Sequence, residues 1–294
     1  MANARSAVIE AAVLQDHILN QQFVTAPLKP RPPDCHKGMF GSIGILGGAA
    51  SMIGAALLAG RAALKCGAGR VYVALLADDA PSVDLQQPEL MLRTPAQMFE
   101  LANLSAVVVG PGLGHANDAM RWLQHALASD LPLILDADAL NLLAIHHELR
   151  QQLRHRPAPS ILTPHPGEAA RLMGYGVDAI QHDRMDAAQM MAERFRSIIV
   201  LKGAGTVCAL PDRRWFINPT GNSGLSSAGT GDVLSGTIAA FIAQQLSPQQ
   251  ATLLAVYLHG AAADDLVQRG IGPIGLTASE VIDAARQILN SWIY

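Results

Sequence analysis

Charged and aromatic side chains are scarce in this sequence of 294 residues. Charged residues make up 15% of it and aromatic residues 4%, whereas half of the residues are hydrophobic. The net charge of −3 and an isoelectric point near 6.3 give no general attraction to nucleic acid or to an anionic membrane. Alanine, leucine, valine, isoleucine and glycine must supply most of the core, which suits close packing of helices on a sheet.

Cysteine is equally rare. Cys35, Cys66 and Cys208 are far apart and form no CxxC or other metal-ligand pattern, so we expect reduced thiols in a cytoplasmic protein. The N-terminus contains Glu10 and Asp16 and lacks a long apolar run, which argues against a signal peptide.

One segment has to be tested as a membrane span, because residues 39–60 contain no charged side chain across 22 positions. Six of those positions are glycine, including the adjacent Gly47 and Gly48. A buried strand, a glycine turn and a buried helix explain this composition better than a lipid-facing helix does. We therefore expect a soluble protein.

Short apolar runs alternate with helical patterns through most of the chain. Most of the runs are rich in β-branched residues and nearly continuous in apolar ones, as in strands that helices cover on both faces. This alternation predicts an α/β fold with a mostly parallel central sheet and helices on both faces. Strands are predicted at residues 42–46, 70–76, 106–110, 131–136, 160–164 and 197–202, and helices at 53–66, 117–128, 139–153, 167–174 and 183–196.

The C-terminal part departs from this alternation. Residues 206–210 and 214–218 predict a terminal antiparallel hairpin attached to the sheet, and three helices are expected after Gly231. Residues 1–34 form an N-terminal segment, either an ordered arm or a frayed tail. No repeat or linker divides residues 35–294, so we expect one domain there.

Unusual residues follow four of the predicted strands. The strand ends run into residues 111–114 (PGLG), 137–141 (ADALN), 165–168 (HPGE) and 203–206 (GAGT). Because ligands of open α/β sheets lie beyond the carboxyl ends of the strands, these four turns should converge at one edge of the sheet.

Each turn also has a purely structural explanation. The glycines of residues 111–114 could form a simple strand exit, and Asp138 could cap the following helix. The proline and glutamate of residues 165–168 suit the first turn of a helix, and a single histidine such as His165 is more often structural than catalytic. Lys202 could be a solvated strand end. Taken one at a time, these turns do not establish a binding site.

The stretch SSAGTGDVLSG, residues 226–236, is harder to explain by structure alone. Gly229, Thr230 and Gly231 can place successive backbone N–H groups in a concave turn, and a helix from Asp232 adds the positive end of its dipole. Such a turn suits a phosphate, and Asp232 could accept a proton from a hydroxyl group beside it. The alternative is that Asp232 only complements the helix dipole.

Three familiar signatures are absent. The chain has no GxxxxGK[ST] P-loop and no GxSxG nucleophile elbow, and its Gly229-x-Gly231-x-x-Leu234 pattern lacks the third glycine of the dinucleotide-binding fingerprint. A nucleotide phosphate would therefore be held by glycine turns and a helix end, without a P-loop lysine.

The GTGD turn resembles the anion hole of the ribokinase-like superfamily, and the wider sequence resembles one family within it. The segments HKGMFGSIGILGGAASMIGAALLAGRAALKCGAGRV, VVVGPGLG, LILDADALNLLA, LTPHPGEAARLMG, VLKGAGTV and GNSGLSSAGTGDVLSG occur in the order typical of the ADP-dependent NAD(P)H-hydrate dehydratase family. The resemblance spans about residues 35–290. It implies a ribokinase-like fold and phosphoryl transfer from ADP, or ATP, to the 6-hydroxyl of NADH or NADPH hydrate, followed by loss of phosphate.

The resemblance also implies roles for individual residues. Asp232 would be the base, and Gly229, Thr230 and Gly231 would stabilise the moving phosphoryl group. The hydrate would contact Ala55, Gly112, His165 and Asp232. The adenine nucleotide, ADP or its product AMP, would contact Lys202, Gly203, Ala204, Gly205, Thr206 and Gly231. Magnesium (Mg2+) would accompany the nucleotide near Asp138, Asn141 and Glu168.

Two departures and two alternatives remain. Ser223 and Ala228 stand where the family often has proline and glycine. No epimerase domain precedes the dehydratase-like region, so we expect action on the S-hydrate alone and a separate epimerase for the R form. The family forms homo-oligomers, and the exposed faces of the Ala/Leu-rich C-terminal helices could pack on another subunit, so we expect a homotetramer. The alternatives are a ribokinase-like kinase of a hydroxymethyl vitamin precursor and a nucleotide-binding protein without turnover. The HPGE turn argues against the first, and Asp232 against the second.

Overall fold

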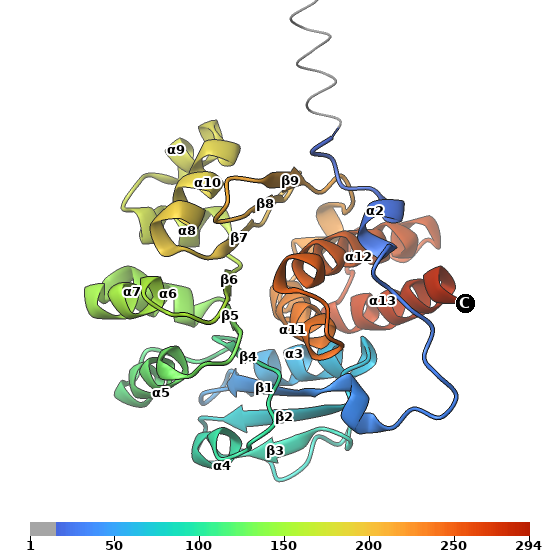
Figure 1. The fold of residues 1–294 in the computed structure, drawn as a ribbon, viewed down its shortest axis with the longest axis horizontal. Coiled ribbons are helices and arrows are strands. Elements are labelled where there is room, and N and C mark those ends of the chain that lie inside the picture. Colours follow the sequence, from blue (N-terminus) through green and yellow to red (C-terminus); the bar gives the residue numbers. More distant parts are fainter. Residues whose placement is uncertain (1–15) are drawn as a thin grey trace, which may run out of the picture.

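The computed structural model describes residues 16–294, and one nine-stranded sheet forms the centre of this part (Figure 1). The strand order is β3-β2-β1-β4-β5-β6-β7-β8-β9. The strands are β1 (Ser42–Gly47), β2 (Arg70–Leu75), β3 (Met91–Arg93), β4 (Ala106–Val109), β5 (Leu133–Leu135), β6 (Ser160–Leu162), β7 (Ile198–Leu201), β8 (Val207–Ala209) and β9 (Trp215–Ile217).

Strand pairing follows the predicted alternation. From β3 to β7 neighbouring strands are parallel, with Ile45 opposite Val73 on one side and Val108 on the other. Strand β8 pairs antiparallel with β7, and β9 pairs antiparallel with β8. The predicted α/β fold with a terminal antiparallel hairpin is therefore confirmed. Most of the strands end earlier than predicted, because their last polar and glycine residues leave the sheet to form loops at its carboxyl edge.

Two layers of helices enclose the sheet (Figure 1). One core lies under α3, α11, α12 and α13, and the other lies under the remaining helices from α4 to α10. The first layer comprises α3 (Ile53–Lys65), α11 (Thr230–Ala243), α12 (Pro248–Gln268) and α13 (Ala278–Ile293). The second comprises α4 (Pro95–Phe99), α5 (Asn117–Ala128), α6 (Asp138–Ile145), α7 (His147–Arg154), α8 (Pro166–Met173), α9 (Val177–His182) and α10 (Arg184–Phe195).

Some elements differ from the prediction. The helix expected at residues 139–153 is divided into α6 and α7, because His146 adopts an extended conformation between them. Helix α11 begins at Thr230, two residues before the expected start at Asp232. The elements β3, α4 and α9 were not predicted, since three to six residues give no clear period.

The N-terminal segment forms an ordered arm from residue 16 onward, which supports one of the two alternatives for it. Ile18 pairs with Ile217 of β9, and α2 (Gln21–Thr25) begins with a side-chain cap from Asn20. The chain then passes α12 and α13 to reach the short 3-10 helix η1 (Lys37–Phe40), just before β1 (Figure 1). A second 3-10 helix, η2 (Ser223–Leu225), precedes α11. The earlier part of the segment lies outside the described residues.

The uncharged segment at residues 39–60 forms the end of η1, β1, a turn and the start of α3. Among residues 16–294, every helix is too short or too polar to cross a membrane.

Candidate functional site

The loops after β1 and β4 meet at the carboxyl edge of the sheet, as expected for parallel strands. The backbone N–H of Gly48 donates to the Pro111 carbonyl at 3.0 Å, and that of Ala49 donates to the Gly112 carbonyl at 2.7 Å. Gly112 has a φ of 58°, a left-handed conformation that favours glycine. The turn after β4 is therefore hydrogen-bonded to the loop after β1, and is more than a strand exit.

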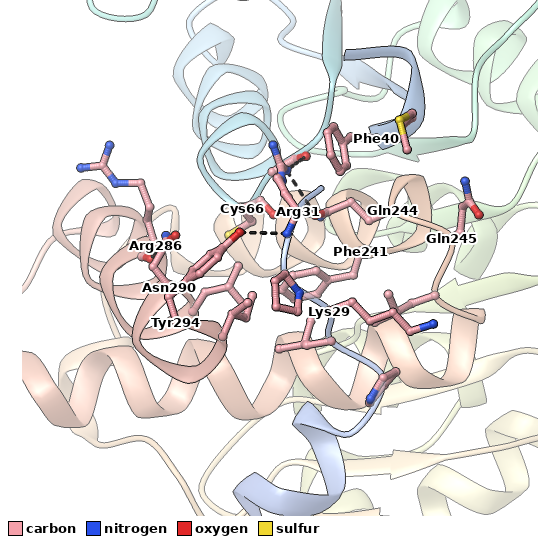
Figure 2. A pocket seen from close by; sticks show the side chains of 18 of the residues that line it. Lys29, Arg31, Phe40, Cys66, Phe241, Gln244, Gln245, Arg286, Asn290 and Tyr294 are labelled. Carbon is pink, nitrogen blue, oxygen red and sulfur yellow. Dashed lines mark hydrogen bonds between the residues drawn. The ribbon is translucent and has the colours of Figure 1, made fainter. Parts of the chain in front are cut away.

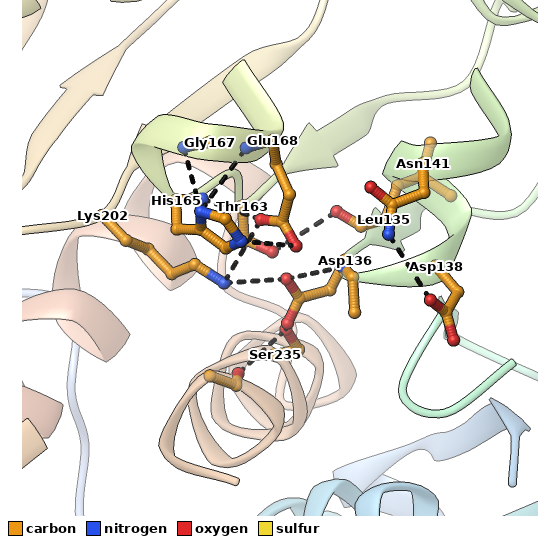
Figure 3. Close-up of polar contacts among 12 residues, drawn as sticks. Leu135, Asp136, Asp138, Asn141, Thr163, His165, Gly167, Glu168, Lys202 and Ser235 are labelled. Carbon is orange, nitrogen blue, oxygen red and sulfur yellow. Dashed lines mark hydrogen bonds and ion pairs between the residues drawn. The ribbon is translucent and has the colours of Figure 1, made fainter. Parts of the chain in front are cut away.

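Asp136 follows β5 and lies at the centre of this edge (Figure 3). Its carboxylate is buried, with Oδ1 at 2.9 Å from Lys202 Nζ and Oδ2 accepting a hydrogen bond of 2.7 Å from Ser235 Oγ. Burial raises the pKa of Asp136, but Lys202 and Ser235 outweigh this effect and hold it below its usual value. The interpretation of Lys202 as a solvated strand end is therefore wrong, since its side chain is only 22% exposed and ion-paired.

His165 and Glu168 form a capping box at the start of α8. His165 Nδ1 accepts from the Gly167 N–H at 3.0 Å, and Glu168 Oε2 accepts from the His165 N–H at 2.8 Å. Pro166 occupies the first helical turn, so the structural explanation of this loop is confirmed. The imidazole is nevertheless 50% exposed, and it can face a ligand while it caps the helix.

Asp138 does not cap α6, contrary to its structural explanation. The N-cap position belongs to Ala137, which makes no side-chain cap and has a φ of 49° in a sparsely populated region. Asp138 Oδ2 instead accepts from the Gly114 N–H at 2.8 Å, and Oδ1 lies 3.4 Å from His115 Nε2. Asp138 therefore joins the loops after β4 and β5.

The three residues predicted to lie near magnesium do not converge as one set (Figure 3). Asn141 Nδ2 lies 3.4 Å from Asp138 Oδ1, but the amide oxygen of Asn141 accepts a hydrogen bond from Arg171. Glu168 lies instead beside Lys202, at 4.0 Å. The described part of the chain holds no group of three His, Cys, Asp or Glu side chains placed for a metal. These residues do not fit a preassembled magnesium cage, and their role stays a prediction.

The GTGD turn supplies the first residues of α11. Gly229 is the N-cap residue, with a φ of 87° that glycine adopts without strain. The hydroxyl of Thr230 lies 2.8 Å from the Leu225 carbonyl and 2.9 Å from the Ser227 carbonyl. It therefore ties the start of α11 to the residues that precede the turn. The backbone N–H groups at this helix start have no partner within the helix, which suits an anion.

Gly231 brings this turn against the ion pair. A Cβ at this position would lie 3.1 Å from Lys202 Nζ and 3.7 Å from a carboxylate oxygen of Asp136. Only glycine leaves the backbone and the ammonium group this close without displacing the lysine. The GTGD turn and the Lys202 ammonium therefore lie side by side, next to the Asp136 carboxylate.

Asp232, in the first turn of α11, has its pKa raised to about 7. Burial is the largest cause, the negative charges of Asp136, Asp138 and Glu168 add to it, and Lys202 opposes it. Burial likewise raises the pKa of Glu168 to about 7. A carboxyl group with such a pKa can take up and release a proton near neutral pH.

A cavity of about 450 Å3, here called the nucleotide cavity, adjoins this cluster. All of the predicted nucleotide segment, Lys202–Thr206, lines it, together with Thr230 and Gly231. Its far side comes from the loop after β9 and from α12, including His259. Burial lowers the pKa of His259 to about 4, so this imidazole is neutral at pH 7.

A larger cavity of about 630 Å3, here called the arm cavity, lies at the amino edge of the sheet (Figure 2). It lies between residues 27–32 of the arm and the C-terminal ends of α3, α11 and α13. Arg31 occupies part of it, donating to the Gly67 carbonyl at 2.6 Å and lying over the Phe40 ring at 3.7 Å. The Arg31 N–H donates to the hydroxyl of Tyr294 at 2.9 Å. Contacts within the chain already engage these polar groups.

The residues predicted to contact the hydrate come from four loops or helix starts at the carboxyl edge. Ala55 is in the first turn of α3, Gly112 follows β4, His165 precedes α8, and Asp232 begins α11. Their contact with a hydrate stays a prediction.

Asp136, Ser235 and His259 are absent from the predicted site residues. Asp136 ends an apolar run, and its acidic charge at the end of a buried parallel strand is the signal that could have identified it. Ser235 and His259 lie within helical patterns, where the sequence does not show which face meets the site.

A model of the NAD(P)H-hydrate dehydratase family matches residues 43–286. The chain belongs to the NAD(P)H-hydrate dehydratase family. An ADP-dependent (S)-NAD(P)H-hydrate dehydratase from Neisseria meningitidis is 41% identical over 265 residues, 89% of this chain and 89% of that protein. A bifunctional NAD(P)H-hydrate repair enzyme from Coxiella burnetii is 39% identical over 284 residues, 95% of this chain but 57% of that protein. The chain thus spans little more than half of the bifunctional relative.

Two solved structures share the fold of this chain. An ADP/ATP-dependent NAD(P)H-hydrate dehydratase from Bacillus subtilis, co-crystallised with ATP and Mg2+, has a TM-score of 0.83 and 33% identity, covering 94% of this chain and 98% of that one. A ribokinase-like superfamily protein from Enterococcus faecalis has a TM-score of 0.81 and 26% identity, covering 94% and 96%. The ribokinase-like fold of this dehydratase family member is therefore confirmed.

Proposed function

We propose that this protein repairs (6S)-NADH and NADPH hydrate by ADP-dependent dehydration. First, the 6-hydroxyl oxygen attacks the terminal phosphorus of ADP, the bond to AMP breaks, and the hydroxyl proton passes to Asp232. The ring nitrogen then expels phosphate from C6, and loss of a proton from C5 restores the reduced ring. The products are the reduced coenzyme, AMP and phosphate. Phosphate leaves readily, whereas hydroxide is a poor leaving group.

One observation carries the proposal: Asp232 directly follows Gly231, which lines the nucleotide cavity. Its pKa of about 7 suits a general base at neutral pH. The helix start at residues 229–231 would offer backbone donors to the phosphoryl group as it moves. Family membership supports dehydration as the chemistry that follows.

The two ligands would approach this point from different sides. We assign the nucleotide to Lys202–Thr206 and Gly231, which line the nucleotide cavity, and the hydrate to Ala55, Gly112 and His165. A volume of about 450 Å3 is in the range of small-molecule sites. ADP is the proposed donor and ATP a substitute, since the relatives are named ADP-dependent and ADP/ATP-dependent.

Magnesium would enter with the nucleotide phosphates, as its preference for phosphate and water ligands allows. Some relatives are named bifunctional repair enzymes, which supports a second repair activity that complements the dehydratase. We propose that a separate hydrate epimerase supplies this second activity. A homotetramer remains a prediction of the family resemblance, and a cytoplasmic location remains a prediction from the three widely spaced cysteines.

The test is to incubate the purified protein with S-NADPH hydrate, Mg2+ and either ADP or ATP, and to follow the absorbance of the reduced nicotinamide. We expect recovery with ADP, one AMP and one phosphate released per coenzyme, and no recovery with Asp232→Asn. A phosphate that stays on the organic product would instead indicate a kinase. Tight ADP binding with neither outcome would indicate a nucleotide-binding protein without turnover.

A further inference from the structure

Lys202 belongs to two parts of the carboxyl edge, because it lines the nucleotide cavity and also lies among carboxylates. Resting on the proposed function, we propose that Asp136, held by Ser235, is the positioning residue that keeps the Lys202 ammonium between the nucleotide cavity and Asp232. Asp136 itself does not line that cavity. It would act through Lys202 and not by touching a substrate.

Three donors fix the carboxylate of Asp136. Oδ1 lies 2.9 Å from Lys202 Nζ and accepts from the Ala137 N–H at 2.9 Å, while Oδ2 accepts from Ser235 Oγ at 2.7 Å. The Ser235 hydroxyl is fully buried and also lies 3.2 Å from the Gly231 carbonyl. A continuous set of contacts therefore links the end of β5, the end of β7 and the GTGD turn.

Lys202 requires such a partner because other carboxylates compete for its charge. Glu168 Oε2 lies 4.0 Å from Nζ, and the negative charge of Asp232 also acts on this ammonium. A lysine side chain has many rotamers, and an ammonium drawn to Asp232 would pair with the proposed base. Asp136 Oδ1 instead holds the Lys202 ammonium at 2.9 Å. In this position the ammonium lies close to the GTGD turn, since a Cβ added to Gly231 would be 3.1 Å from Nζ.

Stability alone does not account for this arrangement. Desolvation cancels much of the attraction within a buried ion pair, and an apolar pair of similar volume is often as stable. The chain offers a matched case in Asp84 and Arg61, where Oδ1 lies 2.7 Å from Nη2 and the carboxylate is 4% exposed. Neither of these residues lines the nucleotide cavity. Asp84→Asn is therefore a control for breaking a buried pair away from the site.

The first experiment compares Asp136→Asn with this control in the full-length protein. Asn keeps the shape of Asp but removes its charge. We expect the affinity for Mg2+-ADP, measured by titration calorimetry, to fall about tenfold and kcat to fall roughly 100-fold, with little change in KM for the hydrate. Ser235→Ala should show the same pattern to a smaller degree. Asp84→Asn should lower the melting temperature and leave ADP affinity and kcat unchanged.

The second experiment is a double-mutant cycle with Lys202→Met. If Asp136 acts through Lys202, adding Asp136→Asn to Lys202→Met should weaken ADP binding less than about twofold further. The double variant should also melt at a higher temperature than Lys202→Met alone, in which Asp136 stays buried without its partner.

The positioning role is overturned if folded Asp136→Asn binds ADP and turns over like the wild type, or loses no more than Asp84→Asn does. It is equally overturned if the cost of Asp136→Asn is undiminished in the Lys202→Met background. ADP affinity reports on Lys202 whatever the second substrate is. A failure of the proposed function would appear separately, as a wild-type protein that binds ADP but does not dehydrate the hydrate.

Discussion

The arm cavity and the nucleotide cavity differ in whether contacts within the protein already engage the polar groups beside them. At the amino edge, Arg31 fills part of the larger arm cavity and is already bonded to Gly67 and Gln244 and placed over Phe40. At the carboxyl edge, the smaller nucleotide cavity adjoins carboxylates such as Asp232, whose pKa burial raises to about 7. By volume alone, the arm cavity would be chosen as the functional site. The carboxylate with a raised pKa indicates the nucleotide cavity instead.

The difference follows from which backbone groups each edge presents. Helices α3 and α11 end at the amino edge, and side chains of the protein satisfy their last carbonyl groups, as Gln244 does for Cys66 at 2.9 Å. Helix α11 starts at the carboxyl edge, where no side chain caps its N-terminus, so backbone N–H groups of its first turn can donate to a ligand. A buried group whose ionisation costs stability is better evidence of function than empty space is.

The largest expected effect is that of Asp232→Asn, which removes the proposed base. We expect kcat to fall by about 10³-fold while ADP still binds. Because the folded-state pKa of Asp232 lies above its ordinary value of 3.8, the unfolded chain releases this proton first, so stability falls as the pH rises from 3.8 to about 7 and stays lowered at higher pH. The variant should therefore melt a few degrees above the wild type at alkaline pH, and lose this advantage in acid. A variant that loses both activity and stability would make Asp232 a structural group.

Gly231→Ala should have a smaller effect than Asp232→Asn, because its Cβ would lie 3.1 Å from a Lys202 Nζ that can move. The lysine can yield by a few tenths of an ångström, so we expect a 10- to 100-fold loss of kcat/KM, on the order of what small misplacements cost. Alanine favours a helix more than glycine does, so the melting temperature should not fall. Steady-state kinetics and thermal melts test both parts, and unchanged kinetics would show that the turn does not meet the phosphate.

The pH dependence of kcat/KM offers a more graded test. If Asp232 must be ionised, activity should rise with pH and reach half its maximum near the pKa of about 7. Lys202 lowers the pKa of Asp232, so Lys202→Met should move this midpoint to higher pH, whatever its effect on the maximum. A midpoint that stays in place, or moves to lower pH, would contradict the assigned balance of charges.

The sequence predicted the carboxyl edge more completely than the amino edge, for physical reasons. Parallel strands carry their exit loops to one edge, so an apolar run followed by GAGT or HPGE already places a site loop. Asp136 was missed because its partner Lys202 is distant in the sequence, and only the folded sheet brings the two charges together. The arm cavity has no sequence signal, since it arises where residues 27–32 cross three helix ends.

The smallest effect on activity is expected at that arm cavity, from Arg31→Ala. The variant loses the hydrogen bond to Gly67 and the contact with Phe40, so we expect a stability loss of about 1–2 kcal/mol. ADP affinity and kcat should remain within about twofold of the wild type, because breaking contacts at one edge need not disturb an independent site at the other. Chemical denaturation and calorimetry measure the two quantities. A loss of kcat larger than that of Gly231→Ala would mean that the two edges are coupled, since Arg31 contacts α11 through Gln244, and the site begins at the other end of the same helix.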